Sequence, residues 1–497
     1  MFNKIQKKLL LKYPLLWNTK FVPMVCIGLL INLLYFFIGY ADGAINFKER
    51  YDSDIDFTFF SFCFLISLVL LILWLVNYFR NNSLKSFYPK SKYSLFYEWI
   101  QILVIVLLLI GFYFPFEIGR KLHKTSYLTE TEAKKRCEII SKADFFIDGS
   151  FGEAEVDSVN SVLKDTVIDG EPVYQNIVYK DYVTIFGKKY STTSLINRNI
   201  REFAFFTDAE DSLRKVEVQK ILFKDKKDEV KKIMGDYMSI IKEHGLLTNL
   251  TKEKWFKITY NHPEFKKYEL INSYAPNDST DIYSTNYYDE TVVTTSVADY
   301  ETKKEYSKYF IEQNTLSHNY QVISRAYTSS IFKEDSLLPF LYFGFGISLL
   351  IFSFRVTSGK TWLIGIVTLG VLNLVTGIIS AISGEFITYT ILIILFILAI
   401  IIYYLSILIS KKSQNFSKIV LNLLLWLFGA LIPLIYSTYF EIYKKSIQHL
   451  ESYYYDQHYM FLSDFVPNML SINLIIVFAS MFFLCSSIRK WKGIAEE

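Results

Sequence analysis

The sequence predicts an α-helical polytopic membrane protein of about eight transmembrane helices, with an inserted extracytoplasmic α+β domain. Three observations predict this fold class. The 497 residues are 52% hydrophobic, and their mean hydropathy of +0.24 is high for a soluble chain of this length. The apolar residues gather into runs of about 20, the length that a helix needs to cross a ~30 Å hydrocarbon core. Lysine and arginine concentrate in alternate connections between these runs, which is typical of membrane proteins with a fixed orientation.

Eight apolar runs define the expected membrane domain. A basic, amphipathic segment over residues 2–20 precedes them and is expected to form an interfacial helix. Residues 1–118 then hold this helix and three spans, whereas residues 337–497 hold five spans and an outer loop at 439–467. The runs cover residues 21–40, 57–79, 98–118, 337–354, 362–382, 386–409, 418–438 and 468–488.

The basic residues predict the orientation of the spans. Seventeen Lys and Arg residues fall in the two ends of the chain and in the connections on the same side, and four fall in the short connections opposite. Because short cytoplasmic segments carry the excess of Lys and Arg, both termini are expected in the cytoplasm and residues 119–336 outside it. The expected location is the inner (plasma) membrane of a bacterium, crossed several times.

The 119–336 domain is polar and long enough for a core of its own. Residues 130–143 are expected to form a helix, and the alternating Val, Ile and Tyr of 172–206 predict strands. Residues 208–244 predict one long amphipathic helix, and 301–333 a helix that continues into the fourth span. The expected apolar stripe of the long helix consists of Leu213, Ile221, Leu222, Val230, Ile233, Met234 and Ile241.

Polar residues inside the spans are few. No ionisable residue lies near the centre of an expected span, which argues against a proton-coupled carrier. Asn32, Asn373 and Asn422 are instead expected to form hydrogen bonds between helices. The SGKT sequence at 358–361 lacks the earlier glycine and the preceding strand of a phosphate-binding loop. We expect a helix end there, and no cofactor.

A cluster of polar residues in the 439–467 loop is a weak candidate for a site. His449, Asp456 and His458 combine imidazole with carboxylate, which could bind a metal or transfer protons. Their spacing matches no known ligand motif, so an ordinary polar loop is the favoured interpretation. A membrane-embedded transferase that acts at the outer face is the functional alternative that would use them.

The connection between the second and third spans contains the more informative motif. Residues 86–99 read SFYPKSKYSLFYEW, in which Pro89 is followed by Ser91, Lys92 and Tyr93 and then by a short helix. Together with the basic N-terminal helix, this connection resembles the cytoplasmic coupling segment of ABC-2-type exporter permeases. That resemblance covers about the first 120 residues. The chain departs from the family in having eight expected spans rather than six, and in its insertion after the third span.

The resemblance implies a permease-like membrane subunit of a transport or export complex, driven by a separate cytoplasmic ATPase. Pro89, Ser91, Lys92 and Tyr93 would then contact the nucleotide-binding subunit, and a homodimer is implied as well. The alternative is a membrane scaffold or sensor whose 119–336 domain binds an envelope ligand or partner. The net charge of +4 gives no support for nucleic-acid binding, and no catalytic motif supports an intrinsic enzymatic activity.

Overall fold

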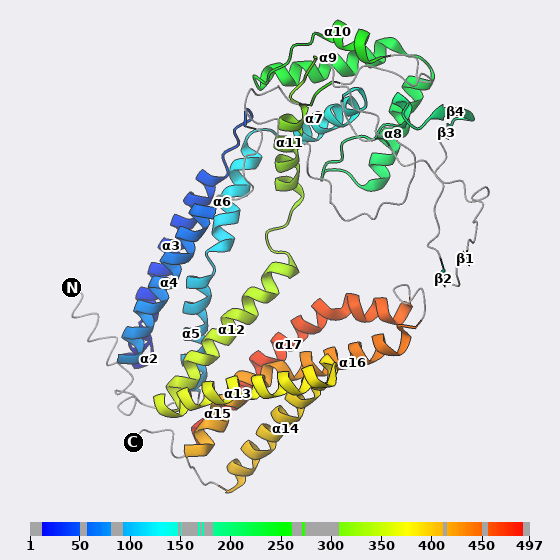
Figure 1. Ribbon diagram of the computed structural model, residues 1–497. Helices are drawn as coiled ribbons and strands as arrows, with labels where there is room; N and C mark the ends of the chain where they lie inside the picture. Colours follow the sequence, from blue (N-terminus) through cyan, green and yellow to red (C-terminus); the bar gives the residue numbers. More distant parts are fainter. Residues whose placement is uncertain are drawn as a thin grey trace, which may run out of the picture. The chain divides into compact units, whose positions relative to one another are not determined.

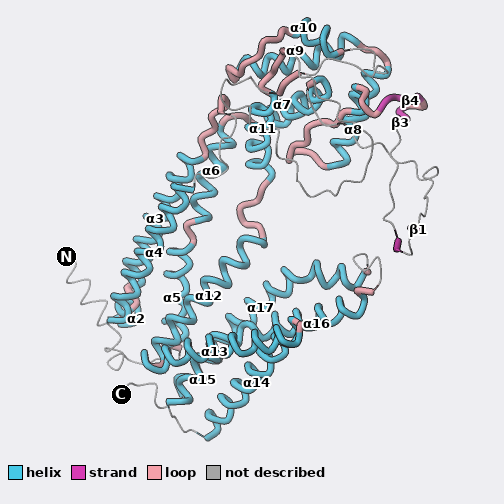
Figure 2. The backbone as a smooth tube through the Cα atoms, in the orientation of Figure 1, coloured by secondary structure: helices cyan, strands magenta, loops and turns pink. Residues whose placement is uncertain are grey.

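The computed structural model describes residues 12–49, 57–80, 93–147, 151, 167–168, 171–172, 182–260, 271–273, 308–410, 415–449 and 456–490. Helices predominate among them (Figure 2). The chain divides into two compact units. Unit 1 comprises Met1–Gly39, Phe57–Gly119 and Ser330–Glu497, and unit 2 comprises Tyr40–Asp56 and Arg120–Ser329.

Eight helical segments in the described part of the chain are long and apolar enough to cross a membrane, which confirms the predicted number. Three of them extend well beyond the predicted spans, because the apolar runs continue into amphipathic turns. The segments are Phe21–Asp42, Phe57–Arg80, Ser94–Ser126, Ser336–Val356, Gly359–Ser383, Phe386–Ile409, Phe416–Ile447 and Gln457–Ile488. The chain is therefore a multi-pass membrane protein by the length and composition of its helices.

Eleven elements carry these segments, and the short helix α2 precedes them. Figure 1 labels the helices. Among the residues described at the beginning of the chain, the helices are α2 (Pro14–Asn18), α3 (Phe21–Asp42), α4 (Phe57–Arg80), α5 (Ser94–Ile110) and α6 (Tyr113–Ser126). The later elements are α12 (Glu334–Val356), α13 (Gly359–Ser383), α14 (Phe386–Ser410), α15 (Asn415–Leu427), the 3-10 turn η4 (Phe428–Ala430), α16 (Leu431–Ile447) and α17 (Gln457–Lys490). The predicted loop 439–467 is thus helical as far as Ile447 and again from Gln457.

Two of the spans are interrupted, and a proline follows each interruption. The third span breaks at Gly111 between α5 and α6, and the seventh breaks at η4 between α15 and α16. Pro115 and Pro433 are each the third residue of the helix that follows. In the first turn a proline removes no intrahelical hydrogen bond, so these residues begin new helices instead of kinking old ones.

Helix α5 lies at the centre of unit 1. It packs against α4, α12 and α17 and buries Trp99, Ile102, Ile105, Val106 and Leu109. The approach of α12 is close because Gly344 has no side chain: a Cβ atom there would lie 2.4 Å from Leu107 Cδ2. Small residues allow this kind of close helix packing in membranes.

The three asparagines form hydrogen bonds between helices, as predicted. Asn32 Nδ2 on α3 donates to the Leu108 carbonyl of α5 at 2.9 Å. Asn373 Oδ1 on α13 accepts from Tyr389 Oη of α14 at 2.8 Å. Asn422 on α15 accepts from the Thr357 hydroxyl, just after α12.

Unit 2 is mainly helical. Its helices are α7 (Glu130–Ala143), α8 (Asp208–Phe223), α9 (Lys227–Glu243), α10 (Lys252–Thr259) and α11 (Gln313–Thr328), with short 3-10 turns η2 (Asp144–Phe146) and η3 (Leu195–Asn197). The helix predicted at 130–143 is confirmed. The described strands form two antiparallel pairs, β1 (Val167–Ile168) with β2 (Glu171–Pro172) and β3 (Tyr182–Ile185) with β4 (Lys188–Ser191). Phe186 and Gly187 both have positive φ, as a two-residue hairpin turn requires.

The single helix predicted over 208–244 is wrong. Helices α8 and α9 are separated at Lys224–Lys226, where Asp225 adopts a left-handed backbone with φ of 50°. The charged run at 224–229 offers no apolar side chain to hold a helix on the core, and Tyr260 Oη fixes the bend by donating to Asp225 Oδ1. Leu213, expected in the apolar stripe, is 70% exposed.

The helix predicted over 301–333 also differs from the structure. Helix α11 ends at Thr328, and α12 begins at Glu334, so no continuous helix joins them. Residues 301–307 lie outside the described part of the chain.

Candidate functional site

The most unusual feature of unit 1 is a charge cluster buried within the membrane-spanning helices. Glu98 on α5 lies at its centre, and its Oε1 atom accepts three hydrogen bonds. The donors are Arg355 Nε of α12 at 2.7 Å, Tyr78 Oη of α4 at 3.0 Å and Asn18 Nδ2 of α2 at 3.2 Å. All four residues are 5% exposed or less. One carboxylate oxygen therefore joins four helices.

The positions of Glu98 and Arg355 follow from the helices that carry them. Glu98 lies in the second turn of α5, on the same face as the buried Ile102 and Ile105. Arg355 is the penultimate residue of α12. A carboxylate near a helix N-terminus and a guanidinium near a helix C-terminus both interact favourably with the helix dipoles. The pair is thus stabilised by its helices as well as by mutual attraction.

A second layer of hydrogen bonds fastens the N-terminal segment to the same place. Trp74 Nε1 on α4 donates to the Thr19 carbonyl at 2.9 Å, and the Thr19 hydroxyl donates to Gln101 Oε1 on α5 at 2.7 Å. The Trp74 ring also stacks on Tyr78. Residues 14–19 are therefore part of the cluster.

The contribution of a buried ion pair to stability depends on the presence of both partners. Removing one partner of a buried ion pair leaves an uncompensated charge and costs about 3–5 kcal/mol. Ionisable residues inside a membrane are rare and usually functional. Sequence reasoning missed this pair because Glu98 lay at the edge of its predicted span and Arg355 was counted as a topological charge. The sequence did indicate that the two residues could meet. Glu98 lies at the start of the third span and Arg355 at the end of the fourth, and these two ends lie at the same membrane face.

The predicted coupling residues are described only in part. Pro89, Ser91 and Lys92 lie outside the described residues. Tyr93 immediately precedes α5, and its ring stacks on Phe482 of α17 with 5.1 Å between centroids. The predicted coupling segment, residues 86–99, therefore overlaps the start of α5, the helix that carries Glu98.

Two residues of the histidine and aspartate cluster proposed from the sequence, Asp456 and His458, contact helix α16. Asp456 Oδ1 accepts from the Tyr459 backbone amide at 2.8 Å, so it caps α17, and from Tyr443 Oη of α16 at 2.9 Å. These bonds hold the pKa of Asp456 below its usual value. His458 Nε2 lies 3.1 Å from Tyr439 Oη, also on α16. His449 is exposed beyond the end of α16.

No hydrogen bond or ion pair in the described part of the chain joins His449 to Asp456 or His458. Across those same residues, no group of three or more His, Cys, Asp and Glu side chains is arranged to hold a metal ion. Ser358 and Thr361 of the SGKT sequence form a capping box at the start of α13, as a helix end requires.

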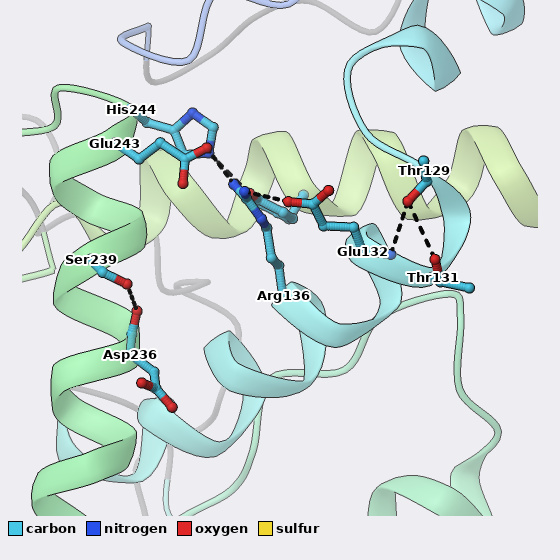
Figure 3. Close-up of polar contacts among 9 residues, drawn as sticks. Thr129, Thr131, Glu132, Arg136, Asp236, Ser239, Glu243 and His244 are labelled. Atoms are coloured by element: carbon cyan, nitrogen blue, oxygen red, sulfur yellow. Dashed lines mark hydrogen bonds and ion pairs between the residues drawn. The ribbon is translucent and has the colours of Figure 1, made fainter.

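A second polar network lies in unit 2 (Figure 3). Arg136 on α7 donates to Glu132 at 2.6 Å, to Glu243 at 2.9 Å and to Tyr320 Oη of α11 at 3.1 Å. Tyr320 Oη in turn lies 2.9 Å from His244 Nε2, just after α9. The His244 ring stacks on Phe47, with 4.1 Å between centroids. The network thus joins α7, α9 and α11 to the 43–49 segment.

The charges of this network respond to burial and to one another. Burial alone disfavours the charged Arg136, but its hydrogen bonds to Tyr320, Glu243 and Glu132 raise the pKa overall. Burial lowers the pKa of His244, and the neighbouring Arg136 lowers it further against the opposing effect of Glu243. The lowered pKa favours neutral His244, whose Nε2 atom can accept a hydrogen bond from the Tyr320 hydroxyl.

Comparison with protein-family models, with curated proteins and with solved structures gives no match for this chain. Functional inference for this chain therefore rests on the geometry of the two units and on the sequence motifs.

Proposed function

We propose that this protein is the membrane subunit of a transport or export complex driven by a separate cytoplasmic ATPase. The observation that carries the proposal is the position of Glu98 relative to the 81–92 segment. Tyr78 lies in the last turn of α4, before this segment, and Glu98 lies in the second turn of α5, after it. The helices before and after residues 81–92 are therefore tied to one carboxylate.

This arrangement supports a mechanism for transmitting movement. A subunit that displaces residues 86–93 on ATP binding moves the end of α4 and the start of α5 together. Because Glu98 holds Arg355, α12 is drawn along, and Gly344 keeps α12 close to α5. Interfaces that switch between two packed arrangements transmit such small displacements over long distances. In this proposal both termini are cytoplasmic and unit 2 is extracytoplasmic, as the Lys and Arg distribution favours.

The test is purification of the tagged chain in mild detergent, with mass spectrometry and an ATPase assay of the eluate. We expect a stoichiometric nucleotide-binding subunit that is lost when residues 89–93 are replaced by a Gly/Ser linker. Residues 411–415 provide a matched control, because they also contain two lysines and one serine. Retention after that second replacement, with loss after the first, supports the proposal. An eluate without ATPase, or equal loss in both variants, refutes it.

A scaffold or sensor remains the second candidate, and a groove in unit 2 favours it. The cavity between α8 and α11 has a volume of about 1010 Å³ and a polar lining. A sensor requires a ligand-binding groove of this kind, whereas the transport proposal does not depend on one. The two are distinguished by the same purification, because a sensor without an ATPase partner elutes without nucleotide-binding subunits.

A further inference from the structure

The polar groove of unit 2 has one wall formed by α11. The lining positions on this helix are 314, 317, 318, 321 and 325, which fall on one face at helical spacing. The opposite face of α11 carries Leu316, Tyr320 and Ile323, which are fully buried in the core. The helix is thus packed on one side and presents polar side chains on the other.

Helix α8 forms the other wall. Asp208, Asp211, Ser212 and Lys215 line the groove from this side. Two of these residues are already engaged: Asp211 forms an ion pair with Arg214, and Lys215 Nζ donates to Asn199 Oδ1 at 2.9 Å. Burial raises the pKa of Asp211 against the effect of Arg214. These contacts engage part of the α8 wall.

Other lining side chains have no such contacts. Within the described residues, no hydrogen bond or ion pair engages the side chains of Arg325 and Gln321 on one wall or of Asp208 and Glu202 on the other. The Ser317 hydroxyl is buried and also lacks a partner there. Buried polar groups are normally hydrogen-bonded, so Ser317 indicates that something else completes the site. Among the side chains without such contacts, the groove offers a cation on the α11 side and carboxylates on the α8 side, where the cations Arg201 and Lys215 are engaged by Asp144 and Asn199.

The lining also limits the chemistry of the ligand. Of the fifteen described residues that line the groove, Ile200 alone is apolar, and the imidazole of His318 is the single aromatic ring. Nucleobases are bound largely by stacking on aromatic rings, and most drug-sized ligands require apolar walls, so this lining suits neither class well. The volume lies at the upper end of the roughly 300–1,000 Å³ typical of small-ligand sites. A ligand larger than one amino acid, with charges of both signs and amide groups, fits these features.

We propose that this groove binds a free peptide of a few residues, with its carboxylate at Arg325 and its ammonium group at Asp208 and Glu202. Gln321, Ser317 and Ser212 would contact the peptide amides. The inference does not depend on an ATPase partner, because the groove lies wholly within unit 2.

The experiment uses the full-length protein in detergent and a randomised tetrapeptide mixture with free termini. Retained peptides are identified by mass spectrometry after rapid separation from unbound material. We expect retention to fall about tenfold or more in Arg325→Gln and in Asp208→Asn, because each removes a charge-assisted hydrogen bond. Lys135→Gln is the matched control, since Lys135 is exposed in unit 2 away from the groove. Thermal melting verifies that all three variants fold.

The same mixture with acetylated and amidated ends completes the test. Retention of free peptides only, with loss in both groove variants, supports the proposal. Equal retention of the blocked mixture assigns the groove to an internal protein segment and overturns it. Retention unchanged in the variants, or absent altogether, overturns it as well.

Discussion

The two units use charged side chains in opposite ways. In unit 1 Glu98 and Arg355 are buried and satisfied by one another and by Tyr78 and Asn18. In unit 2 the lining of the α8–α11 groove leaves Arg325 and Asp208 without side-chain partners in the described residues. The cluster around Glu98, which we call closed because its charges are paired within the protein, joins helices, since removing one of its side chains destabilises the fold. The charged side chains of the α8–α11 groove that have no such contacts are available to a ligand. The comparison therefore assigns a mechanical role to the first and a recognition role to the second.

The largest expected effect comes from breaking the closed cluster. Glu98→Ala should lower the free energy of unfolding by about 3–5 kcal/mol, because the buried charge of Arg355 loses the carboxylate that compensates it. The control is Glu385→Ala, which breaks the exposed pair with Lys445 and should cost less than about 1 kcal/mol. Denaturation in mixed micelles measures both. The double replacement Glu98→Leu with Arg355→Met should recover most of the loss. Equal effects of Glu98→Ala and Glu385→Ala would contradict the comparison.

A smaller effect is expected at the Arg136 network of unit 2. Arg136→Met removes the hydrogen bonds to Glu132, Glu243 and Tyr320 while keeping much of the side-chain volume. We expect a loss of about 1.5–3 kcal/mol in the free energy of unfolding, the range for hydrogen bonds to charged groups. Arg136→Lys should recover part of it. An unchanged melting temperature in Arg136→Met would show that this network adds nothing to the packing of α7, α9 and α11.

The smallest expected effect is a pH dependence at His244. Its pKa is lowered in the folded protein, so the unfolded chain binds more protons as the pH falls through the ordinary value near 6.5. The contribution of neutral His244 to stability is therefore complete at neutral pH and decreases below about 6.5. Melting temperatures at pH 7.5 and 5.5 should differ more in the natural protein than in His244→Gln. A larger difference in the variant would refute the assignment.

The sequence predicts the membrane unit much better than unit 2. Runs of about 20 apolar residues are determined by the bilayer itself, so the eight spans could be located without knowledge of their packing. Asn32, Asn373 and Asn422 were predicted correctly for the same reason, because a polar group in hydrocarbon needs a partner on another helix.

Unit 2 depends on contacts that the local sequence does not encode. The bend at Asp225 is fixed by Tyr260, and the exposure of Leu213 follows from how α8 packs. The buried pair of Glu98 and Arg355 lies in the spans, yet it was missed for a similar reason. The two residues are 257 positions apart, and only the pairing of α5 with α12 brings them together.

The packing of the 43–49 segment in unit 2 has a consequence for the order of synthesis. The Phe47 carbonyl accepts a hydrogen bond from Asn319, which is 272 residues later in the chain. At roughly 5–20 residues per second, the ribosome needs about 15 to 55 seconds to make that interval. Phe47 lacks His244 until residue 244 has been made and lacks α11 until the end of the interval. The first connection is therefore without these contacts while the second and third spans are synthesised. The nascent protein therefore depends on whatever protects that short aromatic segment until α11 has emerged.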